Sequence, residues 1–214
     1  MSETSSKPVA GTGFFNRLAD ILILNFLFMI CCIPIVTIFC SAASMYSVML
    51  RIVRNEEEGV VKPFFRFFGR NFVKSLPYMA LLALAFVLVM SGLMIAGYND
   101  SAVMAGIVLG IAVILLTWNG WVTPLFAQFD NTVGAMLMNG LRLMKNNLRE
   151  SLVILILNSY LFILFAVSPT VLTYVLYVWM FVGSALAAWI TCNMLVPIFD
   201  SLIAPQEATE ESDE

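Results

Sequence analysis

Residues 78–98, YMALLALAFVLVMSGLMIAGY, are followed after Asn99, Asp100 and Ser101 by residues 102–127, AVMAGIVLGIAVILLTWNGWVTPLFA. A helix needs about 20 apolar residues to cross the hydrocarbon core of a bilayer, and both runs reach that length without a charged side chain. The three polar residues between them leave room for a tight turn and nothing longer. The two runs therefore predict a transmembrane helical hairpin.

The composition of the whole chain agrees with a membrane location. Of the 214 residues, 61% are hydrophobic and 12% are charged, about half the charged share of roughly 25% that is usual in soluble domains. Mean hydropathy is +0.93. A water-soluble fold of this length buries about 70% of its chain surface, so it has no place for so much apolar surface. The net charge of -3 and the lack of a basic tail argue against nucleic acid as a partner.

Four further spans are predicted around the hairpin. Ser168 and Pro169 separate two apolar runs, because a residue before proline disfavours helix. The apolar region near the N-terminus is too long for one crossing and has Pro34 near its middle, which predicts two spans folded at that residue. The expected architecture is an all-α bundle of six transmembrane helices at residues 14–33, 35–54, 78–98, 102–127, 148–167 and 170–199, with disordered ends at 1–13 and 200–214.

The eleven lysines and arginines support an even number of crossings. They fall in three segments, residues 7–17, 51–74 and 142–149. With six spans all three segments lie on the cytoplasmic side, as the positive-inside rule requires, and both termini are cytoplasmic. A five-span alternative with one long helix kinked at Pro34 places Lys7 and Arg17 outside. We expect a multi-pass membrane protein with both ends in the cytoplasm.

The first basic loop has the pattern of an amphipathic helix. Within residues 60–76 a base recurs every four residues, at Lys62, Arg66, Arg70 and Lys74, and aromatic and aliphatic side chains occupy the other side. This pattern predicts an interfacial helix whose bases attract the anionic headgroups of the inner leaflet. The alternative is a helix packed beneath the bundle, its bases solvated.

The second basic loop resembles the first after a shift of 76 positions. The shift places Asn71 on Asn147 and Arg66 on Arg142 without a gap. Two units related by an axis along the membrane normal are therefore expected, the second with its own surface helix bearing Arg142, Lys145 and Arg149. Both matched asparagines precede a returning span, where an amide is expected to cap the start of the helix.

Several segments together resemble the YesL family of bacterial integral membrane proteins. They are residues 16–20 (NRLAD), 24–25 (LN), 32–37 (CIPIVT), Tyr46, 54–59 (RNEEEG), 64–72 (FFRFFGRNF) and, more weakly, 123–130 (TPLFAQFD). The chain departs from the family pattern at Phe39, where a glycine is usual. The resemblance implies a membrane protein of unknown biochemical function whose genes often lie beside carbohydrate-uptake systems, which is an association and no mechanism.

The sequence offers little reactive chemistry. It has no histidine, and its four cysteines lack a CxxC spacing, so no metal, no cofactor and no catalytic residue is expected. Among the charged residues, Asp20 lies furthest inside a predicted span, about two turns from its start, and Arg17 three residues before it on the same helical face predicts an interfacial ion pair or a snorkelled end.

Uncharged polar residues in the spans are the better candidates for a site. Asn25, Asn119 and Asn158 each place an amide in hydrocarbon, where it needs a partner. A kink at Pro124 beside Asn119 is expected to open a polar notch that holds a sugar hydroxyl or a lipid headgroup. The pairs Gly106 with Gly110 and Ser184 with Ala188 have the small-xxx-small spacing of close helix contacts, expected within the bundle.

Three functions compete on these observations. A non-catalytic accessory or regulatory module of carbohydrate uptake or metabolism needs no reactive residue, and its partners are the bilayer and an uptake-system subunit or a second copy of the chain. A small transporter for a sugar or lipid-like solute is the alternative, supported by the parallel repeat. An intramembrane enzyme ranks last, because the chain has no histidine and its spans show no paired carboxylates and no activated Ser or Cys arrangement.

Overall fold

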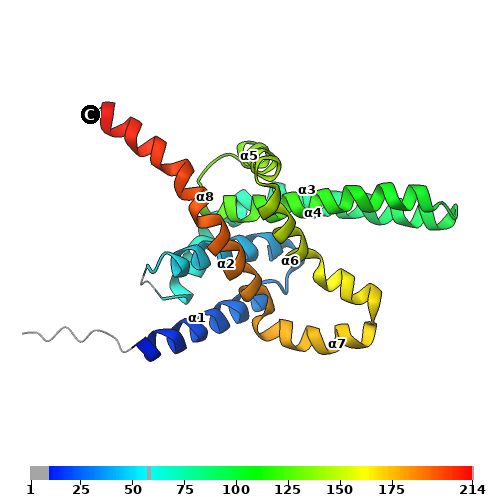
Figure 1. Ribbon diagram of the computed structural model, residues 1–214, viewed down its shortest axis with the longest axis horizontal. Helices are drawn as coiled ribbons and strands as arrows, with labels where there is room; N and C mark the ends of the chain where they lie inside the picture. Colours follow the sequence, from blue (N-terminus) through cyan, green and yellow to red (C-terminus); the bar gives the residue numbers. More distant parts are fainter. Residues whose placement is uncertain (1–9, 57–58, 214) are drawn as a thin grey trace, which may run out of the picture.

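The computed structural model describes residues 10–56 and 59–213, and this part of the chain is all-α (Figure 1). Its α-helices, in chain order, are α1 (Ala10–Cys31), α2 (Ile38–Val53), α3 (Val61–Tyr98), α4 (Ala102–Gln128), α5 (Val133–Asn146), α6 (Leu148–Val167), α7 (Pro169–Val178) and α8 (Ser184–Asp213). A 3₁₀ turn η1 (Ile35–Thr37) precedes α2, and a π-helical segment η2 (Trp179–Gly183) joins α7 to α8.

The chain reverses at Pro34, as the sequence predicts. Helix α1 ends at Cys31, and α2 runs back beside it (Figure 1). Two hydroxyls hold the turn: Thr37 Oγ1 donates to the carbonyls of Cys31 and Pro34, both at 2.5 Å, and Ser41 Oγ donates to Cys31 O at 2.9 Å. These bonds satisfy carbonyls that the end of a helix leaves free. The alternative prediction, one long helix kinked at Pro34, is therefore wrong.

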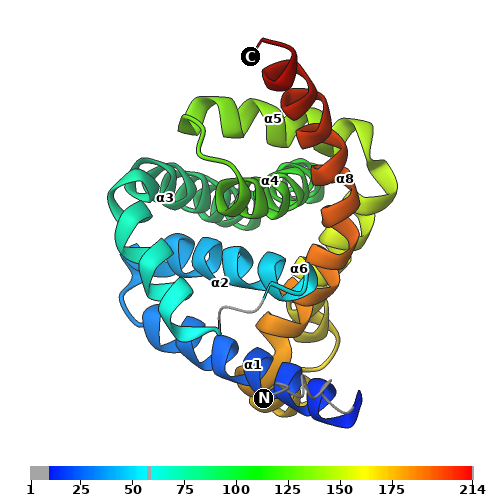
Figure 2. The same ribbon diagram turned by 90° about the vertical axis from the view of Figure 1, so that its left-hand side faces the viewer.

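The hairpin of α3 and α4 is confirmed, but α3 is longer than expected. It runs unbroken for 38 residues, about 57 Å at 1.5 Å per residue, and joins the predicted surface helix of residues 60–76 to the span that follows. Pro77 lies inside α3, and Figure 2 shows the N-terminal part of α3 turning away from the rest. Proline removes one backbone hydrogen bond and bends a helix without ending it.

The described residues contain four helical segments long and apolar enough to cross a membrane. They are Ile35–Val53, Val61–Tyr98, Ala102–Gln128 and Phe181–Ile203. In the α3 and α4 segments only 6% of the most apolar window is buried by protein, so the side chains of this hairpin face outward over most of its length. An apolar surface of this extent needs a lipid environment. The chain is a multi-pass membrane protein.

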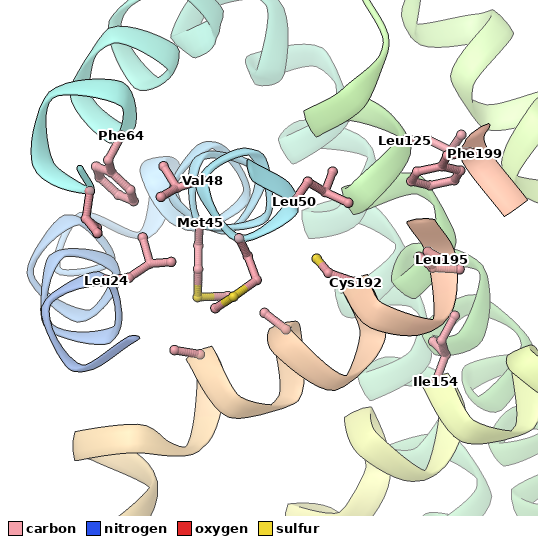
Figure 3. Close-up of a cluster of buried hydrophobic side chains, with 14 of the residues drawn as sticks. Leu24, Met45, Val48, Leu50, Phe64, Leu125, Ile154, Cys192, Leu195 and Phe199 are labelled. Carbon is pink, nitrogen blue, oxygen red and sulfur yellow. The ribbon is translucent and has the colours of Figure 1, made fainter. Parts of the chain in front are cut away.

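The largest cluster of buried side chains joins the two ends of the chain. Leu24 of α1, Met45 and Val48 of α2, and Cys192 and Leu195 of α8 pack together there (Figure 3). A smaller cluster centres on Phe39, which is 3% exposed. Its ring lies edge-on to Tyr78 at 4.3 Å and to Phe126 at 5.2 Å between ring centroids. The phenylalanine that replaces the expected glycine thus fills the space between α2, α3 and α4.

The structure departs from the predicted elements at three places, two of them in the second half of the chain. The predicted span 148–167 coincides with α6, whereas the predicted span 170–199 is divided by η2. Helix α8 continues to Asp213, so the tail from residue 200 is helical where disorder was expected, in keeping with the high helix propensity of alanine and glutamate. At the other end α1 already begins at Ala10; residues 1–9 lie outside the described part.

The small-residue pairs have different outcomes. A side chain on Gly106 or Gly110 would meet nothing within 4 Å, so the contact expected there within the bundle is absent. Ser184 and Ala188 are both buried and pack inward. A small-xxx-small spacing permits close approach and does not require it.

Candidate functional site

A cavity of about 180 Å³ lies where the two halves of the chain meet. Its wall comes from six elements, with Phe28 from α1, Ala42, Met45 and Tyr46 from α2, Asn119, Gly120 and Thr123 from α4, Leu157 and Asn158 from α6, Trp179 from η2, and Ser184 and Ala187 from α8. Two of the three asparagines predicted to form a notch, Asn119 and Asn158, thus share one cavity.

Asn119 presents a free amide nitrogen to this cavity. Its Oδ1 accepts a hydrogen bond from the Tyr78 hydroxyl at 3.0 Å, which fixes the orientation of the amide. Its Nδ2 makes no bond to another described residue. Among the described side chains no fully buried nitrogen or oxygen lacks a partner, so this nitrogen keeps accessible surface on a residue that lines the cavity. It can donate to a ligand oxygen.

Asn158 offers the complementary acceptor. Its Nδ2 donates to the carbonyl of Ile154 at 2.8 Å, and its Oδ1 has no partner among the described residues. Gly120 brings α4 close to α6 at this point: a Cβ on Gly120 would lie 2.3 Å from Ile154 Cγ2 and 3.1 Å from Asn158 Nδ2. The two amides therefore face one space from neighbouring helices.

Asn25 stands behind the cavity wall and does not line it. The side chain is fully buried, and its Oδ1 accepts from the Ser184 hydroxyl and, at 3.0 Å, from the backbone N–H of Ala185. Those groups lie where the π-helical segment changes to α-helix. Asn25 therefore ties α1 to α8 and holds Ser184, which does line the cavity.

Helix irregularities frame the site on two sides. Pro124 has no amide hydrogen, so the carbonyl of Gly120 lacks the bond that an α-helix would supply four residues later. The hydroxyl of Thr123 donates to the Asn119 carbonyl at 2.8 Å. On the other side, Trp179 begins the π-helical segment, a type of helix that is frequent at functional sites. Pro124, where the sequence predicts a kink, lies inside α4, which continues past it to Gln128.

The aromatic wall depends on a second glycine. A Cβ on Gly183 would lie 2.2 Å from Cδ1 of the Trp179 ring, so glycine is needed for the indole to take its place. Trp179, Tyr46 and Ser184 were not predicted as site residues. Trp179 and Ser184 lie in and directly after the π-helical segment, which no residue pattern indicates.

The chemistry of this site is neutral and polar. None of its lining residues is Asp, Glu, Lys or Arg, so no acid and base pair is formed there. Within residues 10–56 and 59–213 no three His, Cys, Asp or Glu side chains are placed to hold a metal ion. Amides, hydroxyls and aromatic faces suit a ligand that carries hydroxyl groups and no charge.

The first basic segment is amphipathic in a different way from that predicted. Lys62, Arg66, Arg70 and Lys74 are exposed on the first part of α3. Phe64 and Phe67, by contrast, are buried against the bundle. The face of α3 that carries Phe64 and Phe67 therefore packs on the bundle, as the alternative prediction has it. Exposed apolar side chains such as Phe65 and Val73 remain beside the bases for contact with lipid.

The second basic segment is a separate helix. Arg142 and Lys145 lie on α5, and Arg149 on the first turn of α6; all three are exposed. Trp118 Nε1 donates to Leu137 O at 3.0 Å, and Gly140 packs on α4, where a Cβ would lie 2.7 Å from Val122 Cγ2. Helix α5 thus packs across α4 at the end where the bases gather (Figure 2).

The predicted helix caps are placed differently. Asn71 is buried inside the continuous α3, and its Nδ2 donates to Phe67 O at 3.1 Å. Asn147 follows α5, and its Nδ2 donates to Leu143 O at 3.0 Å. Both satisfy a carbonyl four residues earlier, whereas the sequence predicts that they cap the next helix.

The ion pair predicted between Arg17 and Asp20 is not formed. Arg17 donates a hydrogen bond to Asn55 Oδ1, and Asp20 has no ion pair among the described residues.

Residues 21–93, about a third of the chain, match the model of a family described as "Protein of unknown function, DUF624". The matched segment spans the second half of α1, all of α2 and most of α3, and it ends before Asn119 and Asn158. No curated protein and no solved structure matches the chain.

Proposed function

We propose that this protein is a non-catalytic accessory or regulatory module of the bacterial cytoplasmic membrane that binds a small neutral, hydroxyl-rich solute and works with carbohydrate uptake or metabolism. The observation that carries the proposal is the pair of free amide atoms, Asn119 Nδ2 and Asn158 Oδ1, that face one cavity. A donor and an acceptor together suit a hydroxyl group, which both donates and accepts.

The rest of the wall supports a sugar-like ligand. Trp179 and Tyr46 supply aromatic surface, and Ser184 and Thr123 supply hydroxyls. Ligand sites combine apolar and aromatic walls with a few placed polar groups in this way. The lack of charged lining residues disfavours an anionic or cationic solute and removes the groups that acid and base catalysis would use.

Six spans with both ends cytoplasmic remain the proposed threading. In Figure 1 the turns at residues 99–101 and near Ser168 lie toward one side, and the beginning of α1 and the end of α8 lie toward the other. The beginning of α3, which carries four of the bases, lies toward the chain ends as well. This arrangement supports the positive-inside assignment.

The parallel repeat has partial support. Asn71 and Asn147, which correspond under the shift of 76 positions, each donate to the carbonyl four residues before them. The units differ where α3 continues into its span, whereas α5 and α6 are separate helices. Asparagine makes the same local bond elsewhere in the chain, so this likeness is modest support.

The proposed partners follow from the exposed surfaces. The apolar sides of α3 and α4 face lipid, an uptake-system subunit or a second copy of this chain, and the bases of α3, α5 and α6 face anionic headgroups of the inner leaflet.

Ligand binding is tested with the full chain in lipid nanodiscs. The variant Asn158→Ala removes the free acceptor, and Asn193→Ala is its matched control. Asn193 is exposed, and its Nδ2 likewise donates at 2.8 Å to the carbonyl four residues earlier, away from the cavity. Thermal stabilisation is measured across a panel of neutral monosaccharides, disaccharides and polyols. We expect at least one solute to stabilise the parent and the control, and to stabilise Asn158→Ala much less. Equal stabilisation of both variants would exclude this cavity as the site.

A small transporter is the second candidate, and one observation favours it. The helix that follows Ser168 is interrupted at Trp179–Gly183 beside the cavity, and interrupted helices surround the substrate sites of many transporters. Proteoliposomes of the isolated protein separate the two functions. Substrate-specific flux supports the transporter, whereas solute binding without flux, with co-purification of a permease subunit from native membranes, supports the accessory module.

A further inference from the structure

A second, larger hollow lies at the end of the bundle that carries the bases. Its volume is about 410 Å³, and it is formed by the end of α4, the loop at residues 129–132, α5 and the later part of α8. None of its lining residues belongs to the cavity of Asn119 and Asn158. We call it the α5 groove.

Four polar side chains of the α5 groove have no partner. Asn131, Asn139, Asn146 and Arg142 make no hydrogen bond or ion pair with any other described residue, although all line the groove. Every other asparagine whose side chain is described makes at least one hydrogen bond. The unpaired amides of the described chain are thus gathered in one place, around an arginine.

The spacing of these side chains follows from the helix. Asn139, Arg142 and Asn146 are three and four residues apart on α5, so they share one face. Asn131 approaches from the loop before α5. Together they present amide groups and a guanidinium to one volume, and every one of them can donate a hydrogen bond.

The charge of the groove is positive. Asp130 is the one acidic lining residue, and Lys74 of α3 already binds it, with 2.5 Å between Nζ and Oδ1. Arg142 has no counter-ion among the described residues. Lys145 and Arg149 lie nearby on the same surface and add to the positive potential. An anion is the ligand that this balance attracts.

The floor of the groove is apolar. Leu125 and Met136 are buried at its base, and Phe129, Leu143 and the exposed Leu202 border it. A small soluble anion gains nothing from contact with these apolar side chains. A lipid presents a charged headgroup and an apolar body together, so it can contact both the polar and the apolar residues of the groove.

We propose that the α5 groove binds the phosphate-bearing headgroup of an anionic phospholipid, with Arg142 on the phosphate and the amides of Asn139 and Asn146 beside it. The planar guanidinium matches two phosphate oxygens at once. The groove belongs to the inner leaflet if the proposed threading holds, so this inference rests on that part of the proposed function and not on the solute cavity.

The test compares three variants of the full chain, purified in a neutral detergent. Arg142→Gln removes the cation, Asn139→Leu removes a donor without changing the charge, and Lys145→Gln removes a charge from the same helix outside the groove. Binding of phosphatidylglycerol is measured by native mass spectrometry against phosphatidylcholine, with inorganic phosphate as a competitor. We expect the dissociation constant for phosphatidylglycerol to rise at least about fivefold in Arg142→Gln and Asn139→Leu, and to change less than about twofold in Lys145→Gln.

Other outcomes overturn the proposal in distinct ways. Equal losses in Arg142→Gln and Lys145→Gln with no loss in Asn139→Leu would mean general surface attraction. Complete competition by millimolar inorganic phosphate would mean a site for a soluble phosphate ester. If Asn139→Leu is not monodisperse, Asn139→Ala replaces it. Asn158→Ala is expected to bind phosphatidylglycerol normally, so failure of the solute cavity and failure of the groove are separate results.

Discussion

Gly120 decides how closely α4 approaches α6 beside the candidate site. Any side chain there would collide with Ile154, whose Cγ2 lies 2.3 Å from the position of a Cβ. Because Ile154 is fully buried, its side chain has no open space to enter. The helices can separate, or the isoleucine can leave its rotamer, and either response disturbs the cavity wall.

We therefore expect Gly120→Ala to destabilise the protein by about 1–3 kcal/mol. Gly106→Ala is the matched control, because its Cβ would meet nothing within 4 Å and alanine is the better helix former. The thermal midpoint of each variant in detergent gives the comparison. An unchanged midpoint in Gly120→Ala would contradict the tight crossing.

Asn25 carries a prediction of the same kind. Its replacement by alanine leaves the N–H of Ala185 and the hydroxyl of Ser184 without their acceptor inside the protein. An unsatisfied buried group costs about 1–3 kcal/mol, so Asn25→Ala should lower the thermal midpoint clearly. Asn193→Ala, which removes an exposed amide bonded to its own helix, should not; a similar drop in both would argue against the link between α1 and α8.

The candidate site was partly predictable at the residue scale. Asn119 and Asn158 stand out because each is an amide in an apolar run, where hydrocarbon gives it no partner. Asn25 has the same pattern but a structural role, since its bonds go to groups freed where the π-helix ends. The α5 groove was missed, because amides on a polar surface helix look solvated until the fold places Asn131 opposite them.

Among the elements, α3 shows why boundaries are harder to predict than the elements themselves. The change from a basic, aromatic pattern to an uncharged apolar one coincides with Pro77, and both features suggest a break. The helix continues because proline costs only local bonds, and Tyr78 is anchored at once by Asn119 and the ring of Phe39. The hairpin turn was predictable because three polar residues between two long apolar runs leave no alternative.

A pH-dependent contact joins α3 to the loop before α5. The hydrogen bond and positive charge of Lys74, with a smaller effect from Arg70, lower the pKa of Asp130 below its usual value. A carboxyl with a lowered pKa stabilises the fold when it is ionised, so the contribution is present at neutral pH and is lost as the pH falls through the lowered pKa. Both groups are exposed, so the effect on stability is small.

Lys74→Gln is expected to raise the pKa of Asp130 toward its usual value. Carbon-13 NMR of the labelled aspartate carboxyl during an acid titration measures this change. Lys62→Gln, a neutral replacement at another base of the same segment, should leave the titration where it is. If the pKa of Asp130 is the same in the parent and in both variants, the ion pair does not form in solution.

At the scale of the whole molecule, the decisive quantity is the number of crossings. Single cysteines are introduced at Ser5 and Asn99 in a variant whose four native cysteines are replaced by serine or alanine. Intact cells are then treated with a thiol reagent that cannot cross the membrane. Six spans predict labelling at residue 99 and none at residue 5 until the cells are opened. Labelling of residue 5 in intact cells would place the N-terminus outside and contradict the proposed threading.

The hairpin of α3 and α4 extends well beyond the turn between α1 and α2 (Figure 1). If the chain is threaded as proposed, the protein occupies a broad cross-section in the inner leaflet and a narrow one in the outer leaflet. Such a wedge displaces more lipid from the inner leaflet than from the outer leaflet. Its insertion is therefore easiest where the bilayer is already curved with its outer leaflet on the concave side. Curvature of the surrounding membrane would then influence where this protein accumulates in the cell.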